Sequence, residues 1–525
     1  MDASVTATST SPFPPGYRAS GLLLHITSLP SPYGIGDLGP GAFEWIDRLH
    51  EAGQTWWQAL PFGPTGYGDS PYQSLTSFLG SVMMVSPQFL IEDGLLEADD
   101  CAETFPDDTV AYEAVIPFKL RLLRKAWTNF RKGARKDLMA AYEAFCLGRA
   151  SWLEDYALFR ALKSRFNEAW YLEWPQELVL RTPSALAQVR RELADEIDQI
   201  RVSQFFLSRQ AERLKAHARA KGVRIIGDLP FFVSQDSSDV WAHPEMFLLD
   251  ERRRPRFVAG VPPDYFSATG QLWGNPVYDW EALSRTGYAW CIERMRALLA
   301  HVDLVRLDHF RAFAAAWHVP AGSPNAIHGE WVPGPGARFF HAAGKEFEGL
   351  PFIAEDLGVI TPEVCAVRDE FQIPGTRVLQ FAFDGNPDNI HLPNDYSANN
   401  VVYTATHDNA TTREWYQGLP DHERQHLWRY LGGAAGEACD AVSEMIRLAW
   451  CSPAALAITP LQDVLHLGGE ARMNVPGRAA GNWRWRATPR MLAGKNFEWL
   501  SDLTDATNRR VCDNEVRNES DTVTA

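Results

Sequence analysis

The sequence lacks the features of a disulfide framework and of a structural zinc site. Its 525 residues include seven cysteines, scattered from Cys101 to Cys512, and no two of them form a CxxC pair. An odd, scattered set of thiols is typical of proteins in a reducing compartment. The Ser/Thr/Pro-rich start of the chain also lacks the basic and apolar regions of a signal peptide. We therefore expect a cytoplasmic protein.

The sequence also lacks positive charge and long apolar runs. The formal net charge is −16, and no long run of Lys or Arg occurs. An acidic chain of this kind is poorly suited to bind nucleic acids or anionic membranes. No stretch approaches the roughly 18 uninterrupted apolar residues that cross a bilayer. We therefore expect neither nucleic acid nor a membrane as a partner.

Eight short apolar runs, each bounded by turn residues, are spread along the chain. Most are almost continuously apolar, which is typical of strands buried on both faces in a parallel sheet. Helical patterns lie between several runs, and such alternation predicts an α/β fold, a (β/α)₈ or TIM barrel. The runs are Gly21–Ile26, Thr55–Phe62, Val223–Phe232, Val302–Phe310, Pro351–Gly358, Thr376–Phe383, Asn400–Asp408 and Ala454–Leu465.

The spacing of these runs is uneven. The second run ends near Phe62, the third begins near Val223, and the gap between them has mostly helical apolar spacing. Thr182 and Pro183 predict an N-cap and a first-turn proline that open a long helix toward Ala220. The pattern predicts a large, mainly helical insertion between the second and third barrel strands, which either covers the active site or serves stability or oligomerisation.

This pattern divides the chain into four predicted parts. Polar composition predicts a disordered tail at the start of the chain and a frayed tail at its end. The predicted parts are a tail of residues 1–16, a barrel of residues 17–85 and 206–504, an inserted helical unit of residues 86–205, and a tail of residues 505–525.

Four acidic residues lie where apolar runs end. Asp228 follows RIIG, Asp308 follows VRL, Glu355 follows FIA and Asp408 follows YTATH. In a closed parallel barrel these strand ends meet on the face that holds active sites. A single carboxylate after a strand is more often a helix cap or turn former. Four at equivalent positions favour a common site.

Two carboxylates facing one pocket can cleave a glycosidic bond, one as the nucleophile and the other as the acid and base. The nucleophile must stay ionised, and a nearby cation lowers its pKa. Arg306 lies two residues before Asp308, so on a strand both side chains point to the same face. The alternative is a buried ion pair that only holds the strand.

These residues lie in motifs that resemble those of a known family. RLDHF (Arg306–Phe310), AEDLG (Ala354–Gly358) and THDN (Thr406–Asn409), with GDLP upstream, resemble the motif set of the α-amylase clan. More narrowly, the chain resembles a 4-α-glucanotransferase of the amylomaltase type, glycoside hydrolase family 77. Further matches extend the resemblance over most of the chain: HITSLPSPYGIGDLG (His25–Gly39), GPTGYGDSPYQ (Gly63–Gln73), VAGVPPDYFSATGQLWGNPVYDW (Val258–Trp280) and RMNVPG (Arg472–Gly477).

The resemblance implies roles for the three main carboxylates. Asp308 matches the nucleophile, Glu355 the general acid and base, and Asp408 the carboxylate that binds sugar hydroxyls and stabilises the transition state. It also implies contacts with the sugar at subsite −1, where Arg306 lies beside the nucleophile. The other expected substrate-binding residues of the strand ends and of the SPYQ motif are His407, Tyr72, Asp228 and Ser70.

The segment PPDYFSATGQLWG (Pro262–Gly274) is a further expected part of the site. The resemblance places this loop at the border of the active site, where its aromatic rings can stack on acceptor sugars and form a lid. The alternative is an ordered surface loop with a few packed aromatic side chains. The residues expected to bind substrate here are Asp264, Tyr265, Phe266 and Trp273.

The resemblance implies transfer of an α-1,4-glucan segment to the 4-hydroxyl of a glucan or of glucose. The expected substrates are maltooligosaccharides, the mechanism retains anomeric configuration, and the two reacting carboxyls lie about 5 Å apart. No metal or other cofactor is expected. Three alternatives stay open: a hydrolase of the same clan, an inactive glucan-binding protein, and a metal-dependent barrel enzyme that a chelator would inactivate.

Overall fold

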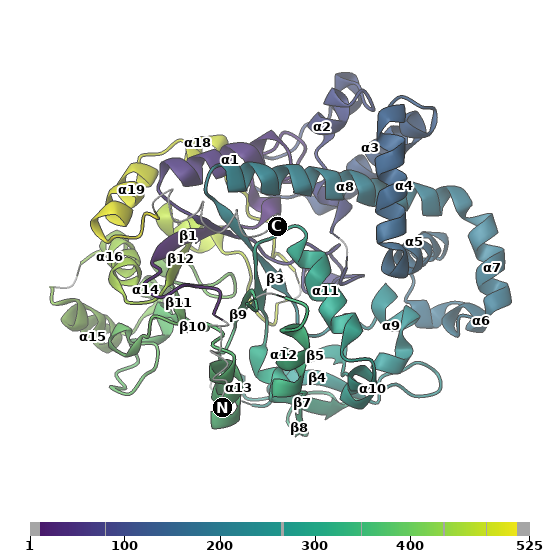
Figure 1. The fold of residues 1–525 in the computed structure, drawn as a ribbon. Helices are drawn as coiled ribbons and strands as arrows, with labels where there is room; N and C mark the ends of the chain where they lie inside the picture. The colour runs from purple at the N-terminus through teal and green to yellow at the C-terminus, as the bar shows by residue number, and fades with distance from the viewer. Residues whose placement is uncertain are drawn as a thin grey trace, which may run out of the picture.

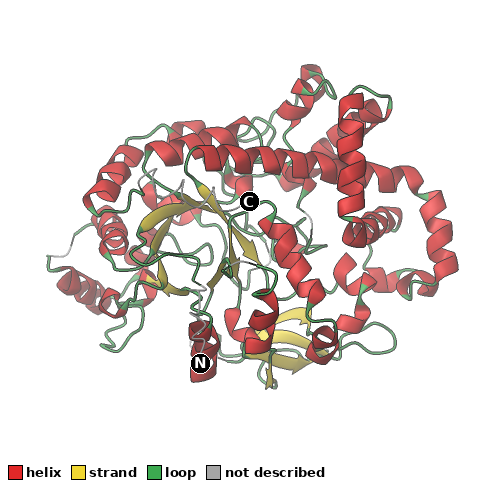
Figure 2. Cartoon of the chain, viewed as in Figure 1, coloured by secondary structure: helices red, strands yellow, loops and turns green. Residues whose placement is uncertain are grey.

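The computed structural model describes residues 11–78, 80–263, 267–347, 349–433, 436–478 and 480–511. At its centre, eight parallel strands close into a barrel in the order β1-β12-β11-β10-β9-β6-β3-β2 (Figure 1). Helices surround this barrel, and a second, smaller sheet lies beside it (Figure 2). The predicted (β/α)₈ barrel is therefore confirmed.

Each barrel strand overlaps one of the eight apolar runs. The strands are almost wholly buried, because side chains of the barrel interior cover one face and helices the other. A Cβ atom at Gly21 would lie 2.3 Å from the Trp56 carbonyl oxygen, so β1 needs glycine where it passes its neighbour. The strands are β1 (Ala19–Leu23), β2 (Trp56–Gln58), β3 (Arg224–Leu229), β6 (Leu304–Leu307), β9 (Phe352–Ala354), β10 (Gly375–Val378), β11 (Asn400–Tyr403) and β12 (Leu456–Pro460).

Most of the longer helices around the barrel bury one apolar face. In α16, for example, Ala441, Met445 and Ala449 are buried while Arg447 is exposed, which is the spacing of an amphipathic helix. The helices around the barrel are α1 (Pro40–Glu51), α10 (Trp280–Arg285), α11 (Ala289–Leu299), α12 (Ala337–Ala343), α13 (Pro362–Glu370), α14 (Thr412–Gly418), α15 (Asp421–Leu431), α16 (Ala438–Cys451), α17 (Leu461–Val464), α18 (Pro489–Leu492) and α19 (Asn496–Ala506).

Between β2 and β3 the chain forms a run of helices. The long helix expected from Pro183 toward Ala220 is instead two helices, because the backbone at Leu193 leaves helical geometry at φ −110° and ψ 26°. The second of them, α8, runs through the boundary expected at residues 205 and 206. The helices are α2 (Pro87–Glu92), α3 (Tyr112–Arg131), α4 (Met139–Gly148), α5 (Ala150–Arg165), α6 (Gln176–Val179), α7 (Pro183–Glu192) and α8 (Ala194–Ala220).

Two cores share these helices. Side chains of α3, α4 and the later part of α8, such as Phe130 and Phe206, belong to the main core that includes the barrel. Phe159 of α5, Trp174 and Trp241 belong instead to a smaller core, built mainly from α5, α6 and α7. The division of the chain into a barrel and one separate inserted unit stays a prediction.

A four-stranded antiparallel sheet lies beside the barrel, in the order β5-β4-β7-β8. It was not predicted, because its strands are short parts of the loops that follow β3 and β6. A short helix, α9 (Ser238–Ala242), lies in the first of these loops. The strands are β4 (Phe257–Val261), β5 (Gln271–Pro276), β7 (Ala315–Pro320) and β8 (Glu330–Pro333).

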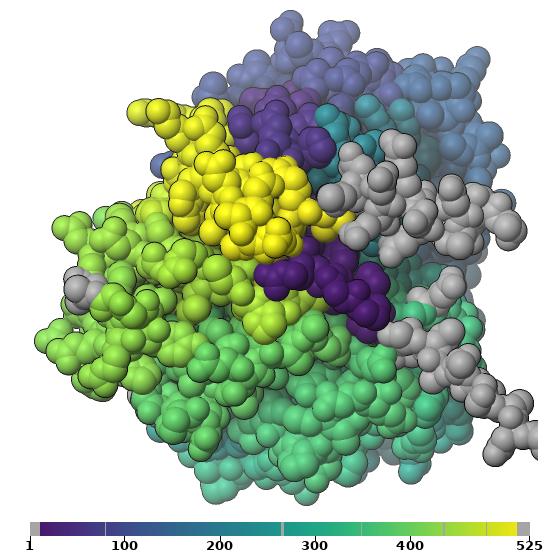
Figure 3. All heavy atoms as spheres, turned by 60° about the vertical axis from the view of Figure 1, so that its left-hand side comes forward, coloured from purple at the N-terminus to yellow at the C-terminus, as the bar shows by residue number. Residues whose placement is uncertain are grey.

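The two ends of the described chain pack against each other (Figure 3). Phe13, expected in the N-terminal tail, is buried and stacks on Tyr17 at a ring distance of 5.3 Å. Arg509, expected in the C-terminal tail, is wholly buried and donates to the Ala19 carbonyl oxygen. Residues 1–10 and 512–525 of the expected tails lie outside the described residues. Among the described helices, none has the length and apolar character to cross a membrane, and the expected cytoplasmic location stays a prediction.

Candidate active site

The strand-end residues expected at the site lie in or just after β3, β6, β9 and β11, of which the first three are adjacent in the barrel and β11 is separated from β9 by β10. Asp228 is in β3, and Arg306 is in β6 with Asp308 just after it. Backbone bonds fix the strand ends to each other: Asp308 N–H donates to the Leu229 carbonyl oxygen at 3.2 Å, and Glu355 N–H to that of Leu307 at 3.1 Å. The carboxyl ends of the strands therefore place these side chains at one mouth of the barrel.

Arg306 joins two carboxylates. Its Nη1 atom donates to Asp228 Oδ2 at 2.7 Å and to Asp308 Oδ1 at 3.2 Å. The side chains of Arg306 and Asp228 are 6% and 0% exposed, whereas that of Asp308 is 28% exposed. Asp228 therefore anchors the guanidinium from the buried side, and Asp308 presents its carboxylate to the open side of the site.

Tyr72 connects this group to the end of β11. Its hydroxyl donates to Asp228 Oδ2 and lies 2.8 Å from His407 Nε2, and its ring stacks on His407 at a centroid distance of 5.3 Å. His407 Nε2 lies 3.3 Å from Asp408 Oδ2. A continuous polar line therefore runs from the Arg306 group to Asp408.

Glu355 faces the same group from β9. The backbone N–H of His309 donates to Glu355 Oε2 at 2.7 Å. His309 adopts the left-handed conformation, with φ 48° and ψ 48°, which turns the chain sharply after Asp308. Its side chain packs edge-on against Trp273, with the ring centroids 4.8 Å apart.

The two carboxyls differ in the protonation that they favour. Burial raises the pKa of Asp308 to about 6, although the Arg306 charge lowers it. Burial raises the pKa of Glu355 further, to about 8, because Arg306 and the His309 N–H only partly offset the loss of water. Near neutral pH the site therefore favours an ionised Asp308 beside a protonated Glu355, a pairing of acid and base that enzymes use.

Asp408 is the most open of these carboxylates, with a side chain that is 48% exposed. Asn474 Nδ2 donates to its Oδ1 atom at 2.6 Å, and Arg472 Nη2 donates to its backbone oxygen at 3.1 Å. Asn474 lies in the matched motif RMNVPG, but its sequence position alone implied no role for it. A side-chain amide inside a matched motif was the signal available for it.

The substrate-binding residues expected in loops lie in different surroundings. The Ser70 hydroxyl accepts from the Tyr72 backbone N–H at 3.2 Å, so it shapes the turn that carries Tyr72. Trp273 lies in β5, donates to Gln271 Oε1 at 3.2 Å and packs on His309. The remaining three, Asp264, Tyr265 and Phe266, lie outside the described residues.

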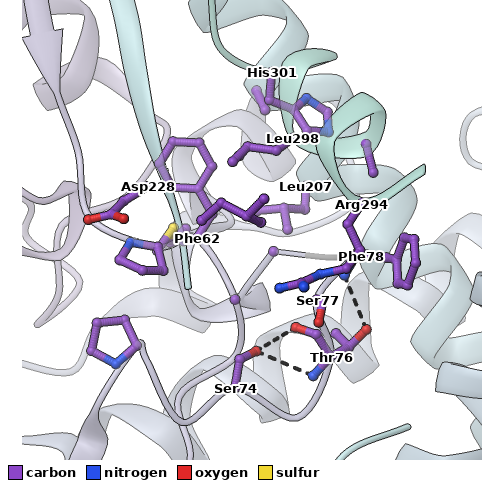
Figure 4. A pocket seen from close by; sticks show the side chains of 18 of the residues that line it. Phe62, Ser74, Thr76, Ser77, Phe78, Leu207, Asp228, Arg294, Leu298 and His301 are labelled. Atoms are coloured by element: carbon purple, nitrogen blue, oxygen red, sulfur yellow. Dashed lines mark hydrogen bonds between the residues drawn. The ribbon is translucent and has the colours of Figure 1, made fainter. Parts of the chain in front are cut away.

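A cavity of about 100 Å³ begins at Asp228 and Tyr72 and continues between the barrel and the helices α8 and α11. Figure 4 shows Asp228 on one side of this cavity and Arg294 and Phe78 on the other. Most of its lining is apolar, including Leu207 from α8. The helices between β2 and β3 therefore come close to the base of the site.

Metal ligands are not clustered in the part of the chain that the structure describes. No group of three or more His, Cys, Asp and Glu side chains there has the arrangement to hold an ion.

The fold and the site together define a class. The molecule is a (β/α)₈ barrel of the kind common among enzymes, and its strand ends gather carboxylates around Arg306 at one mouth.

Comparison with known proteins gives the family. The sequence profile of glycoside hydrolase family 77, described as 4-alpha-glucanotransferase, matches residues 24–492. The 4-alpha-glucanotransferase of Synechocystis sp. is 48% identical over 94% of this chain and 98% of the relative, and that of Thermus thermophilus is 47% identical over 94% and 99%. The amylomaltase from Streptococcus agalactiae, solved in complex with acarbose, superposes with a TM-score of 0.90 at 34% identity, covering 94% of this chain and 99% of that one.

The chain belongs to the 4-α-glucanotransferase family, and it is an enzyme that transfers glucosyl units. The family membership favours transfer over the hydrolase and binding-protein alternatives.

Proposed function

We propose that the enzyme disproportionates maltooligosaccharides by a retaining double displacement. Asp308 attacks the anomeric carbon of the donor while Glu355 gives its proton to the departing glycosidic oxygen. A covalent glucosyl–enzyme forms at Asp308, and the reducing-end fragment of the donor leaves. The observation that carries the proposal is the convergence of two carboxyls at one mouth of the barrel, with Asp308 ion-paired to Arg306 and Glu355 hydrogen-bonded by the backbone N–H of His309, the residue after Asp308.

The second half of the reaction reverses these roles. Glu355, now ionised, takes the proton from the 4-hydroxyl of an acceptor, which attacks the anomeric carbon and releases Asp308. Both a glucan and free glucose carry such a hydroxyl. We expect the two carboxyls to lie about 5 Å apart, as direct nucleophilic attack requires.

The remaining polar residues bind the sugar at subsite −1. Asp408, open to solvent and held by Asn474, accepts hydrogen bonds from sugar hydroxyls, and these strengthen as the ring distorts. Tyr72 offers its ring as a surface for the sugar, and the His407 ring, stacked on that of Tyr72, lies beside it. The acarbose bound by the Streptococcus agalactiae relative supports a glucan-like ligand here.

Transfer requires that water stay away from the glucosyl–enzyme while an acceptor binds. Trp273, packed on His309 next to the Glu355 hydrogen bond, is the aromatic residue of the proposed lid that the structure describes. Trp273→Ala should increase hydrolysis relative to transfer. An unchanged ratio of glucose release to chain lengthening would remove Trp273 from the lid, and Tyr265 and Phe266 would be tested next.

Product analysis with maltotriose alone, in the presence of a chelator, tests the function. We expect glucose and a ladder of longer maltodextrins, with little rise in total reducing ends. Rising reducing ends without longer products would mean hydrolysis. Activity that disappears in chelator and returns with a divalent metal would favour the metal-dependent alternative.

The role of Glu355 has its own test. Glu355→Gln should slow turnover of maltotriose, whereas the first step with α-maltosyl fluoride should stay fast, because fluoride leaves without a proton. Equal losses with both donors would contradict the assignment of Glu355 as the acid.

A further inference from the structure

His25 is a buried side chain that the proposed mechanism does not use. It follows β1, opens the HITSLP segment and is 4% exposed. Neither of its ring nitrogens has a hydrogen-bond partner among the described residues. An imidazole carries one donor and one acceptor when neutral, and an unsatisfied buried polar group costs about 1–3 kcal/mol. The partners of this ring must therefore come from the space beside it.

A small cavity lies beside His25. Its volume is about 30 Å³, and its lining includes both His25 and His407, together with Thr406, Gln462 and Arg472. One water needs about 10–15 Å³, so two or three water molecules fit here, with several polar groups to hold them. The cavity therefore gives the two imidazole rings a route for a water-mediated hydrogen bond.

The hydrogen bonds around Tyr72 indicate which nitrogen of His407 carries a proton in this structure. Tyr72 has one hydroxyl proton and donates it to Asp228 Oδ2, an oxygen that also accepts from Arg306. The Tyr72 oxygen, 2.8 Å from His407 Nε2, must then be the acceptor of that second bond. His407 Nε2 is therefore the donor, and Asp408 Oδ2 at 3.3 Å lies near the same proton.

This assignment leaves Nδ1 of His407 as an acceptor. Burial lowers the pKa of His407, which favours the neutral ring. Its contacts with Tyr72 and Asp408 are made through Nε2. Both His25 and His407 line the same small cavity, so water in it can reach both rings.

We propose that His25 is a positioning residue that fixes the tautomer of His407 through ordered water in the cavity between them. The N–H of His25 donates to water, the water donates to His407 Nδ1, and the proton of His407 stays on Nε2. There it serves Tyr72 and lies beside Asp408. Only the measurement of kcat rests on the proposed function, because the tautomer of His407 is measured in the enzyme without substrate.

Loss of His25 removes the donor that stabilises this tautomer. In the other tautomer, Nε2 is a bare acceptor facing the acceptor Asp408 Oδ2, and the Tyr72 hydroxyl can no longer satisfy both of its neighbours. The hydrogen bonds that join Asp228, Tyr72, His407 and Asp408 are then disrupted. We expect a fall in kcat of about tenfold, the size of one lost hydrogen bond in a transition state, with a smaller change in KM.

The experiment is ¹⁵N NMR of histidine rings in the full-length enzyme, with the His407 signals assigned by a His407→Gln variant. The wild-type ring should be neutral and protonated at Nε2. His25→Leu should shift the His407 signals toward a tautomer mixture and lower kcat. His25→Gln, which keeps a donor and an acceptor, should restore both, and Met473→Leu, which changes an apolar residue of the same cavity, should alter neither.

Each outcome decides the proposal. Protonation of wild-type His407 at Nδ1 overturns it without any variant, which covers the case in which His25→Leu fails to fold. Unchanged His407 signals in folded His25→Leu also overturn it. An inactive wild-type enzyme with the expected tautomer change would instead sink the proposed function and leave this inference standing.

Discussion

The barrel mouth and the helices between β2 and β3 use charge in different ways. In the helices, cations are paired mostly near the surface, as in Arg165 with Glu192 at 2.7 Å, where the side chains are 42% and 36% exposed. At the barrel mouth, buried Arg306 is shared by two carboxylates, and Glu355 is held without a direct ion-pair partner among the described residues. Exposed pairs contribute little to stability, and buried unpaired acids oppose it.

The two regions also differ in what holds them together. Side chains of α5, α6 and α7 form their own apolar core around Phe159, whereas the barrel mouth is a line of polar contacts laid over the main core. Groups that are unfavourable for folding therefore lie at the site, and groups that favour folding lie in the helices that support it. Variants in each region test this separation.

The largest expected effect is at the nucleophile. Asp308→Asn should lower turnover by about 10³-fold or more, because the amide cannot form the glucosyl–enzyme. The fold should survive, since Asp228 still pairs with Arg306. Maltotriose assays and thermal unfolding measure the two quantities separately. Turnover within tenfold of wild type would refute the assignment.

The helical core should show the opposite result. Phe159 is wholly buried against the rings of Trp174 and Trp241, so Phe159→Ala should lower the free energy of unfolding by about 3–5 kcal/mol. The kcat of the folded fraction should stay near that of wild type. Leu147→Ala, at a side chain that is 81% exposed on α4, is the matched control and should change neither quantity. A fall in the kcat of Phe159→Ala as large as that of a site variant would show that the helical core also serves the reaction.

The pH profile of the reaction should follow the two carboxyls. Activity should rise as Asp308 ionises, with a pKa of about 6, and fall as Glu355 loses its proton, with a pKa of about 8, giving a maximum near pH 7. Below the pKa of Asp308 and above that of Glu355, the activity should fall up to about tenfold for each pH unit. A profile flat from pH 5 to 9 would contradict this assignment.

The same shift at Glu355 predicts a stability effect. Between its ordinary pKa and the raised value, the unfolded state binds fewer protons than the folded state, so stability falls as pH rises through about 8. Glu355→Gln removes this loss, so its melting temperature should exceed that of wild type at pH 8 and approach it at pH 5. A lower melting temperature at both pH values would show that Glu355 supports the fold.

The smallest expected effect is at Asn474. Asn474→Ala removes one hydrogen bond to a half-exposed Asp408, so kcat/KM should fall about fivefold, equivalent to about 1 kcal/mol. Asn474→Asp should be worse, because it places a second negative charge beside Asp408. Equal activities of the two variants would show that the amide does not orient Asp408.

The barrel could be read from the sequence because its strands are short apolar runs bounded by turn residues. Asp228, Asp308, Glu355 and Asp408 could be placed at its mouth because the direction of a parallel strand fixes which end carries them. The second sheet and the break at Leu193 could not, because short β-hairpins in loops and a single non-helical residue leave a weak local pattern. Asn474 was missed because an amide gains meaning only from the residue that it contacts.

The sequence by itself therefore determined the fold class, the family motifs and the strand-end positions of the carboxylates, since all three depend on local residue order. Only the tertiary structure decided how the acids differ. Burial raises the pKa of Glu355 above that of Asp308, and it arises from segments far apart in the chain. The same is true of the sharing of Arg306 by two carboxylates and of the cavity lined by His25 and His407. Desolvation and hydrogen-bond geometry depend on the three-dimensional surroundings of a group, which local residue order does not contain.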